Sequence, residues 1–157
     1  MKLAPVFSMI SVAQELFMAD DVLINKAATI ERCVARAKEE YTKGADTFLL
    51  DHTRQDAAIL NIQRACKAAL DMGQHLIRRE RLGVPQSARD VFALLAKAAW
   101  VTPSLAERLQ KMVGFRNVAV HDYQALQLPI VVAVITGHLG DFLEYSREVL
   151  LKDSRSS

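Results

Sequence analysis

The chain has 157 residues, which is enough for one domain with a buried core and few for two. Its 20 basic residues are nearly balanced by 18 acidic ones, for a formal net charge of +2. Bulk charge therefore does not mark a nucleic-acid-binding protein, and any such surface has to come from local clustering. Hydrophobic residues make up 51% of the sequence, and glycine and proline are scarce. This composition favours an all-α fold with apolar surface left for a partner.

The two cysteines, Cys33 and Cys66, lie on or beside apolar helical stripes, and neither has a second cysteine or a histidine at metal-ligand spacing. We therefore expect reduced core thiols in a cytoplasmic protein, without a disulfide framework or a metal site. The most apolar segment, residues 126–140, is interrupted by polar residues and a proline, so we expect no membrane span.

Residues 1–19 faintly resemble a secretory signal, because a short apolar run follows the start of the chain. Only Lys2 precedes that run and Pro5 breaks it, so we discount a signal. We expect an N-terminal extension, either translated from an upstream start codon or forming a short extra helix. A helical bundle domain is then expected at residues 20–151, followed by a frayed polar tail at residues 152–157.

Apolar residues at intervals of three and four predict the first two helices. The first stripe begins at Leu23 and continues to Tyr41, and the helix ends near Gly44. The second helix is expected at roughly residues 47–81. Gly73 lies on its apolar face, where a small residue permits close packing of another helix.

A short third helix is predicted to begin at Ser87, whose hydroxyl can cap free backbone amides. Pro103 suits the first turn of a fourth helix, which continues into residues 115–123. A last helix is expected to begin at Pro129, with one stripe that continues to Val149. Four main helices and one short helix predict an all-α, up-and-down bundle.

Residues 115–123 concentrate reactive side chains in an otherwise apolar, helix-forming sequence. They are Phe115, Arg116, Asn117, Val118, Ala119, Val120, His121, Asp122 and Tyr123. Arginine carries a permanent charge on a fork that fits phosphate oxygens, and histidine can donate or accept a proton near neutral pH. Such a pair suits phosphodiester cleavage, which needs proton transfer and positive charge beside the phosphorus.

On an ideal helix Asn117 and His121 face the same way, whereas Arg116 and His121 diverge by about 140°. Both can reach one ligand only if the helix bends, which Gly114 would ease, or if the length of the arginine compensates. Taken singly, these residues would more commonly form a solvated pair of Arg116 with Asp122 and a capping histidine at a helix end.

The whole string resembles the signature of the HEPN superfamily, specifically its HepT-like toxin ribonucleases. The shared features are an arginine followed by a polar residue, a histidine after four intervening residues, and a tyrosine two places beyond the histidine. Residues 62–77 also resemble the long second helix of that branch, and the resemblance covers roughly residues 20–150. It implies a HEPN-type bundle that cleaves RNA as an endoribonuclease toxin without a metal ion or another cofactor. It also implies a homodimer in which two arginine–histidine motifs line one cleft.

The resemblance also implies roles for the motif residues. Arg116 would bind the scissile phosphate, and His121 would be the general base or the general acid. Asn117 would orient either of them, while Asp122 would fix the imidazole or accept from a backbone amide. Tyr123 would receive AMP from an MNT-type nucleotidyltransferase antitoxin, and the adduct would block the cleft by bulk and charge. The toxin would then form a larger hetero-oligomer with its antitoxin, although a tyrosine considered alone more commonly packs.

Several residues outside the motif are candidates for contacts with RNA. Near the end of the second helix lie Arg78, Arg79 and Arg81. These arginines either contact the RNA backbone or form the cationic end that a helix dipole favours. We expect His75 to be a hydrogen-bonded core residue and His138 to be a core or interface residue. Trp100 is expected to pack in preference to stacking on a base.

Two other functions are consistent with the same residues. A non-catalytic subunit that presents a nucleotide or substrate to a nucleotidyltransferase would use Arg116 and His121 as phosphate ligands. A purely structural helical partner would use neither residue for a ligand. Turnover separates these classes, since only a ribonuclease generates new RNA ends.

Overall fold

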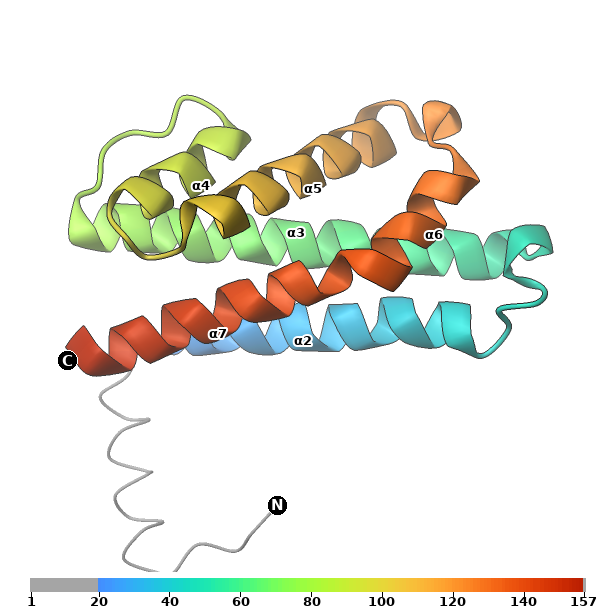
Figure 1. The fold of residues 1–157 in the computed structure, drawn as a ribbon, viewed down its shortest axis with the longest axis horizontal. Helices are drawn as coiled ribbons and strands as arrows, with labels where there is room; N and C mark the ends of the chain where they lie inside the picture. Colours follow the sequence, from blue (N-terminus) through green and yellow to red (C-terminus); the bar gives the residue numbers. More distant parts are fainter. Residues whose placement is uncertain (1–19, 157) are drawn as a thin grey trace, which may run out of the picture.

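The computed structural model describes residues 20–156, which form six α-helices and two short 3-10 turns (Figure 1). In chain order these are α2 (Asp21–Thr42), η1 (Phe48–Leu50), α3 (His52–Glu80), α4 (Ala88–Lys97), α5 (Pro103–His121), η2 (Tyr123–Ala125), α6 (Leu128–Gly137) and α7 (Leu139–Ser156). The predicted all-α bundle is confirmed. The expectations for residues 1–19 lie outside the described part of the chain.

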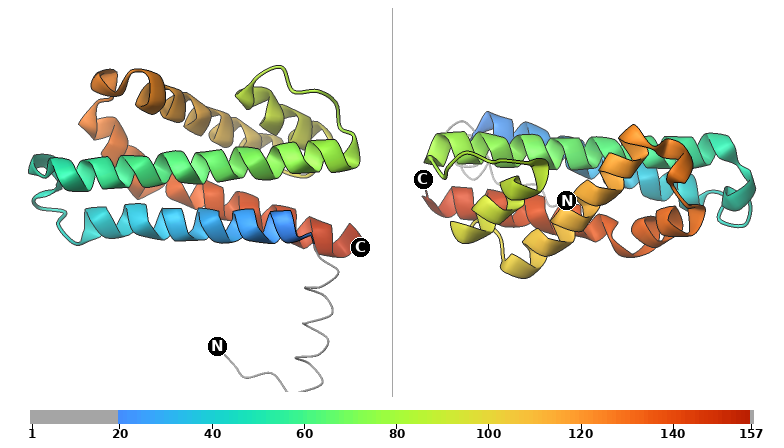
Figure 2. Two further views of the ribbon diagram at one scale, coloured as in Figure 1. Left: turned by 180° about the vertical axis from the view of Figure 1, so that it is seen from behind. Right: turned by 90° about the horizontal axis from the view of Figure 1, so that it is seen from above.

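The antiparallel pair α2 and α3 forms the body of the bundle (Figures 1 and 2). α7 lies along both of them, and α4 and α5 cover another side of α3. The stripe predicted for the first helix is buried as expected, from Leu23 through Ile30 to Ala37. The long α3 therefore contacts every other long helix, and features on its surface lie near α2, α5 and α7.

α3 begins later than the sequence predicted. Phe48 forms part of η1 and is fully buried, with its ring edge-on to Tyr41 at a centroid distance of 5.2 Å. Asp51 leaves the helical conformation, and its side chain accepts from the backbone N–H of Arg54 at 3.1 Å. An aspartate that bonds nearby amides in this way starts a new helix, so the predicted helix at residues 47–81 is divided.

The predicted last helix is also divided, and its parts α6 and α7 meet at a bend of 41°. His138 lies at the bend with φ of −128°, and Gly137 and Gly140 flank it. Glycines weaken a helix because they lose more backbone freedom on folding. His138 is exposed, which excludes the core position, one of the two predicted for it, while the predicted interface position stays a prediction. Its Nδ1 lies 3.6 Å from Asp141 Oδ2.

The described residues contain no single helix that is long and apolar enough to cross a membrane. Only α6 and α7 taken together, across their bend, meet the requirements of length and composition.

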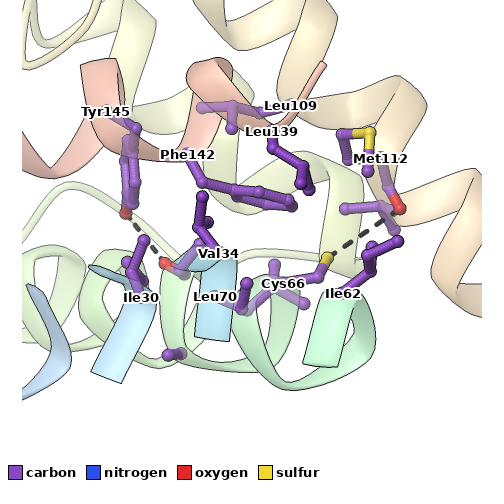
Figure 3. Packing of buried hydrophobic residues seen from close by; sticks show 14 of the residues in the cluster. Ile30, Val34, Ile62, Cys66, Leu70, Leu109, Met112, Leu139, Phe142 and Tyr145 are labelled. Carbon is purple, nitrogen blue, oxygen red and sulfur yellow. Dashed lines mark hydrogen bonds between the residues drawn. The ribbon is translucent and has the colours of Figure 1, made fainter. Parts of the chain in front are cut away.

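Close contacts of α4 and α7 with α3 depend on Gly73, as the sequence suggested (Figure 3 shows part of this core). A Cβ atom at Gly73 would lie 2.5 Å from Cγ1 of Val91 and 3.1 Å from the hydroxyl of Tyr145. That hydroxyl donates to the backbone carbonyl of Ala69 at 2.8 Å. Tyr145 also packs edge-on against Phe92, with ring centroids 5.5 Å apart. Three helices therefore meet at one glycine.

Both cysteines are free and buried, as predicted. The Cys66 thiol points toward the backbone carbonyl of Met112 at 3.9 Å, and burial raises its pKa to about 12. Burial also raises the pKa of Cys33. Both thiols are therefore packing groups, because the reactive form of a cysteine is the thiolate.

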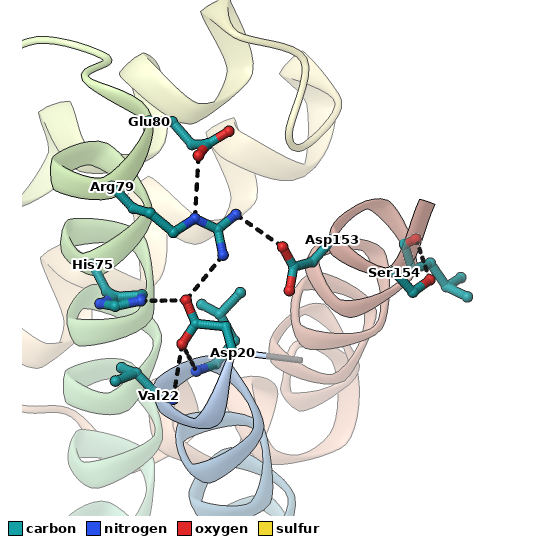
Figure 4. Close-up of polar contacts among 9 residues, drawn as sticks. Asp20, Val22, His75, Arg79, Glu80, Asp153 and Ser154 are labelled. Atoms are coloured by element: carbon teal, nitrogen blue, oxygen red, sulfur yellow. Dashed lines mark hydrogen bonds and ion pairs between the residues drawn. The ribbon is translucent and has the colours of Figure 1, made fainter. Parts of the chain in front are cut away.

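An ionic cluster joins the start of α2 to the ends of α3 and α7 (Figure 4). One Asp20 oxygen accepts from the Val22 amide, while the other lies 2.5 Å from His75 Nε2 and 2.9 Å from Arg79 Nη1. Arg79 also reaches Asp153 at 2.8 Å. Burial acts to raise the pKa of Asp20, but the bonds from His75 and Arg79 outweigh it and lower that pKa. The hydrogen bond predicted for His75 is confirmed, but its predicted core position is wrong, since the residue is only half-buried.

The expected frayed tail is helical instead, since α7 continues to Ser156. Lys152 donates to the carbonyl oxygens of Ala98 and Ala99 and lies 4.8 Å from the centre of the Trp100 ring. Trp100 is buried, so the packing role predicted for it is confirmed. These contacts, together with the ion pair of Asp153, hold the end of α7 against the bundle.

Candidate active site

A groove of about 870 Å³ lies between α2 and α3 and is bordered by the end of α5. Six cationic side chains line it: Lys26, Arg32, Arg36, Arg64, Lys67 and Arg116. Asp71 is the one carboxylate among the described residues that line it. A protein with almost no net charge therefore concentrates positive charge in one concave surface, as binding of a polyanion requires.

Three of these cations have anionic partners. Asp71 pairs with Lys67 at 2.6 Å and with Lys26 at 3.3 Å. Its negative charge therefore partly neutralises the positive charge of these two lysines in the groove. Arg36 pairs with Glu40 at 2.9 Å on its own helix. Among the described residues, no acidic side chain lines the middle of the groove or its α5 border.

The other three cations are available for a ligand. Within residues 20–156, Arg32, Arg64 and Arg116 make no ion pair and no side-chain hydrogen bond. Arg32 and Arg64 lie on facing helices, near enough to the buried Cys33 for both charges to oppose the upward shift of its pKa. Arginine forks without partners, turned toward one groove from different helices, suit phosphate oxygens.

Arg116 is positioned by α5, which begins with Pro103 in its first turn and is capped by the Thr102 hydroxyl. The helix ends at His121, where the Asp122 amide donates to the Val118 carbonyl at 2.8 Å. The prediction that the fourth helix continues into residues 115–123 is confirmed, and the helix ends within the motif. The local distortion suggested at Gly114 is absent from α5, which is α-helical throughout.

Gly114 serves helix packing instead. A Cβ atom there would lie 2.8 Å from Nη2 of Arg89, an α4 side chain that crosses this position and approaches the Gln110 carbonyl. Because α5 stays regular, the divergence of about 140° between Arg116 and His121 is retained.

Only part of the motif faces the groove. Arg116 and Val120, four residues apart on α5, line it. Asn117 and His121 lie on an exposed face beside it, and neither makes a side-chain hydrogen bond to another described residue. One chain therefore brings Arg116 to the cationic groove and leaves the imidazole of His121 available to a separate surface.

Tyr123 lies on η2, which folds back against the beginning of α3. Its hydroxyl donates a hydrogen bond to Asp56, while 43% of the residue stays exposed. Burial and the neighbouring carboxylate raise the pKa of Tyr123 to about 12. The phenol is therefore held in its neutral form and remains partly accessible.

The structure does not bring Arg78, Arg79 and Arg81 to the motif. Arg79 is bound in the ionic cluster with Asp20 and Asp153. Arg78 lies 14 positions beyond Arg64 on α3, roughly 21 Å along the helix axis. These arginines lie near the end of α3 that packs against α7, away from the groove's α5 border (Figure 1).

An apolar hollow of about 400 Å³ lies next to the motif, between α5 and the segment that leads into α6. Its lining includes Phe115, Val118 and Ile130. Val118, Val120 and Ile130 are each more than a third exposed. Apolar side chains gathered beside a polar site are typical of a surface that a partner covers.

The bundle and this site together define a class of all-α proteins. In this class, a helix that ends in an arginine and a histidine lies next to a cationic groove. Residues 30–149 match the family described as Ribonuclease HepT-like. The chain is 50% identical over 126 residues to the mRNA nuclease HepT of Shewanella oneidensis, covering 80% of this chain and 94% of the relative. It is 23% identical over 128 residues to the tRNA nuclease HepT of Aphanizomenon flos-aquae, covering 82% and 87% of the two chains.

Solved structures agree with the sequence relatives. A toxin–antitoxin crystal structure with AMP-PNP matches with a TM-score of 0.79 and 48% identity, over 83% of this chain and 98% of that one. A tri-AMPylated Shewanella oneidensis HEPN toxin in complex with an MNT antitoxin gives the same TM-score and identity, over 83% and 97%. The chain belongs to the HepT-like ribonuclease family. The family and the enzyme class predicted from the motif are thereby confirmed.

Proposed function

We propose that this protein is a cytoplasmic endoribonuclease toxin that cleaves RNA without a metal ion, through Arg116 and His121. The observation that carries the proposal is the position of Arg116. Within residues 20–156 it has no anionic partner, and it lies in a cationic groove on the same helix end as an exposed histidine. Membership of a ribonuclease family supports RNA as the polyanion.

In the proposed reaction, the ribose 2′-hydroxyl attacks the adjacent phosphorus. A histidine takes the hydroxyl proton as general base, and an acid protonates the leaving 5′ oxygen. Arg116 binds the phosphate oxygens and stabilises the negative charge that grows on them in the transition state. Asn117, one helical turn before His121, and Asp122, next to it in the chain, orient the imidazole of His121 in the assembled site.

The site is completed by a second copy of the chain. Arg116 and His121 diverge on a regular helix, and residues 115–123 contain no second histidine to serve as the partner acid or base. The exposed Val118, Val120 and Ile130 around the motif supply apolar surface for pairing. Two motifs in one cleft provide two histidines, one as base and the other as acid.

Substrate RNA is held by the groove arginines. Arg32 and Arg64, on α2 and α3, extend the charge of Arg116 away from the motif and contact backbone phosphates without reading the bases. Arg78, Arg79 and Arg81 are left out of the site because they lie elsewhere on α3. The base sequence at the cut is therefore set by groups other than these arginines.

An MNT-type nucleotidyltransferase antitoxin switches the toxin off by attaching AMP to Tyr123. Support comes from the solved relative that is tri-AMPylated and bound to an MNT antitoxin, and from the partly exposed phenol beside the motif. An added phosphodiester brings bulk and negative charge to a site that binds phosphate. The toxin and antitoxin form a hetero-oligomer larger than the toxin dimer.

Cleavage of total bacterial RNA in EDTA tests the ribonuclease proposal. Antitoxin-free wild type should generate new ends, Arg116→Ala and His121→Ala should generate none, and all should remain folded by circular dichroism. Arg78→Ala is the matched control and should cleave normally. A fully active His121→Ala variant would refute the mechanism. Wild type that binds RNA but never cleaves it, with intact mass excluding AMP, would indicate a non-catalytic binding subunit.

The site of AMP attachment needs a separate experiment. Wild type incubated with ATP and the antitoxin should gain AMP by intact mass, because Tyr123 offers an accessible hydroxyl. Tyr123→Phe removes that hydroxyl and should gain none. An adduct of unchanged mass on Tyr123→Phe would assign the modification to another residue.

A further inference from the structure

Tyr123 and Asp56 form an isolated pair between η2 and α3. Within residues 20–156, the Asp56 carboxylate makes no ion pair, and its one side-chain hydrogen bond is the bond that it accepts from the Tyr123 hydroxyl. Asp56 is exposed, so water can solvate its carboxylate without this hydrogen bond. A carboxylate held directly on a phenol oxygen is in position to accept the phenolic proton.

We propose that Asp56 is the general base for the transfer of AMP to Tyr123. This inference rests on the proposed role of Tyr123 as the AMP acceptor. It adds a catalytic group that the toxin itself contributes, whereas the partner nucleotidyltransferase supplies the bound ATP. The modified protein is then part of the active site for its own modification.

At phosphorus one bond forms and one breaks, and one proton is transferred. The Tyr123 oxygen attacks the α-phosphorus of ATP, and a bond forms between them. The bond from that phosphorus to the oxygen bridging to the β-phosphate breaks, and pyrophosphate leaves with the electron pair. The phenolic proton passes to the Asp56 carboxylate, which afterwards releases it to water.

A base is needed here because the phenol cannot supply a preformed phenolate. The pKa of Tyr123 is raised to about 12 by burial and by Asp56, so the hydroxyl is protonated at neutral pH. A carboxylate is a weak base toward a free phenol. Once the oxygen begins to bond to phosphorus, its proton becomes far more acidic, and transfer to Asp56 becomes favourable as the transition state is approached.

Two substitutions distinguish a base from a group that only positions the phenol. Asp56→Asn keeps a hydrogen-bond acceptor at the same place but cannot take up a proton. Asp56→Ala removes both properties. Loss of a general base typically lowers a rate by about 10²-fold or more. If proton transfer is the role of Asp56, AMP addition should therefore slow by that amount in both variants. If positioning were the role, Asp56→Asn would keep most of the rate.

The experiment is a time course of AMP addition by intact mass, with the purified nucleotidyltransferase antitoxin and varied ATP. Asp46→Asn is the matched control. It removes an exposed carboxylate from the turn before η1 that makes no ion pair or side-chain hydrogen bond in the described residues, and it should react at the wild-type rate. For Asp56→Asn we expect kcat to fall about 10²-fold with an unchanged KM for ATP, and Asp56→Glu should recover part of the rate.

Each outcome decides between the two proposals. Asp56→Asn within about threefold of wild type, with normal circular dichroism, would overturn the role of Asp56 while leaving Tyr123 as the acceptor. An unlabelled wild type, or a Tyr123→Phe variant labelled like wild type, would instead overturn the proposed acceptor and the role of Asp56 with it. If Asp56→Ala fails to fold, Asp56→Asn decides the question alone.

Discussion

Single residues around the motif differ in how much their surroundings constrain them. Arg116, Asn117 and His121 are without side-chain partners in the described chain, so they are free to meet a substrate or a second protomer. Tyr123 is held, because its hydroxyl bonds to Asp56. The same nine-residue string therefore contains groups available for chemistry and one group kept in a fixed place and protonation state.

The hydrogen bond from Tyr123 predicts an observable titration. Asp56→Asn should lower the pKa of Tyr123 from about 12 toward its usual value, because the carboxylate that opposes ionisation is gone. Phenolate absorbance measures this, with Tyr123→Phe assigning the transition. An unchanged titration in Asp56→Asn would show that burial alone sets the pKa.

The raised pKa of Tyr123 also has a consequence for stability. The folded state holds the Tyr123 proton more tightly than the unfolded chain does. The protonated hydroxyl therefore adds to the free energy of unfolding, and this contribution is fully present below the usual tyrosine pKa. It is lost as the pH rises toward the folded value of about 12. Tyr123→Phe should therefore flatten the fall of stability in that alkaline range, as measured by denaturant unfolding.

At the scale of helices, the apolar stripes and capping residues predicted which segments are helical. Ser87 and Pro103 begin α4 and α5 as expected, because capping and fixed backbone angles act locally. The breaks at Asp51 and His138 were not predicted, since the apolar spacing continues through both. The cationic groove was also missed, because Arg32 and Arg64 become neighbours only when α2 packs on α3.

Alanine substitutions at two glycines on different helices should change the stability of the fold in opposite directions. Gly73→Ala should destabilise the fold by about 1–3 kcal/mol, because its Cβ would overlap Val91. Gly140 is helical with nothing within 4 Å of an added Cβ, so Gly140→Ala should stabilise by up to about 1 kcal/mol. Denaturant unfolding measures both, and a destabilised Gly140→Ala would show that α7 needs flexibility at the bend.

If RNA binds in the groove between α2 and α3, the groove arginines should contribute to the salt dependence of RNA affinity. Each contact with a phosphate contributes about 0.7 to the slope of log affinity against log salt for a single strand. Arg32→Ala and Arg64→Ala should each reduce the slope by roughly that amount, whereas Arg78→Ala should not. Equal effects at Arg64 and Arg78 would extend the RNA path along all of α3.

At the scale of the whole molecule, the proposed mechanism needs two chains to complete one site. Arg116, the divergent His121 and the apolar surface around Val118 lie at the end of α5, which borders the groove that also holds Arg32 of α2 and Arg64 of α3. A second copy that covers the apolar surface would bring its own motif next to the first. The proposed pairing rests on the regularity of α5, which the motif spacing alone could not show.

Charged substitutions at this surface should separate pairing from folding. Val118→Asp and Ile130→Asp should shift the protein to a monomer by sedimentation and lose RNA cleavage, with helix content unchanged, because a buried unpaired carboxylate disfavours the interface. Val84→Asp, at an exposed apolar position in the loop before α4, is the control and should stay dimeric and active. A monomeric variant that still cleaves RNA would contradict a shared site.

Cleavage of a singly 2′-deoxy-substituted RNA tests the proposed mechanism most directly. The strongest cut made by wild type in EDTA is first mapped on a defined RNA, and the nucleotide on its 5′ side is then replaced by its 2′-deoxy form. If the 2′-hydroxyl is the nucleophile activated at the Arg116 and His121 site, that cut disappears, and the original products carry a cyclic phosphate and a 5′-hydroxyl. Cutting of the substituted RNA at the original rate would mean that water attacks the phosphorus and would contradict the mechanism.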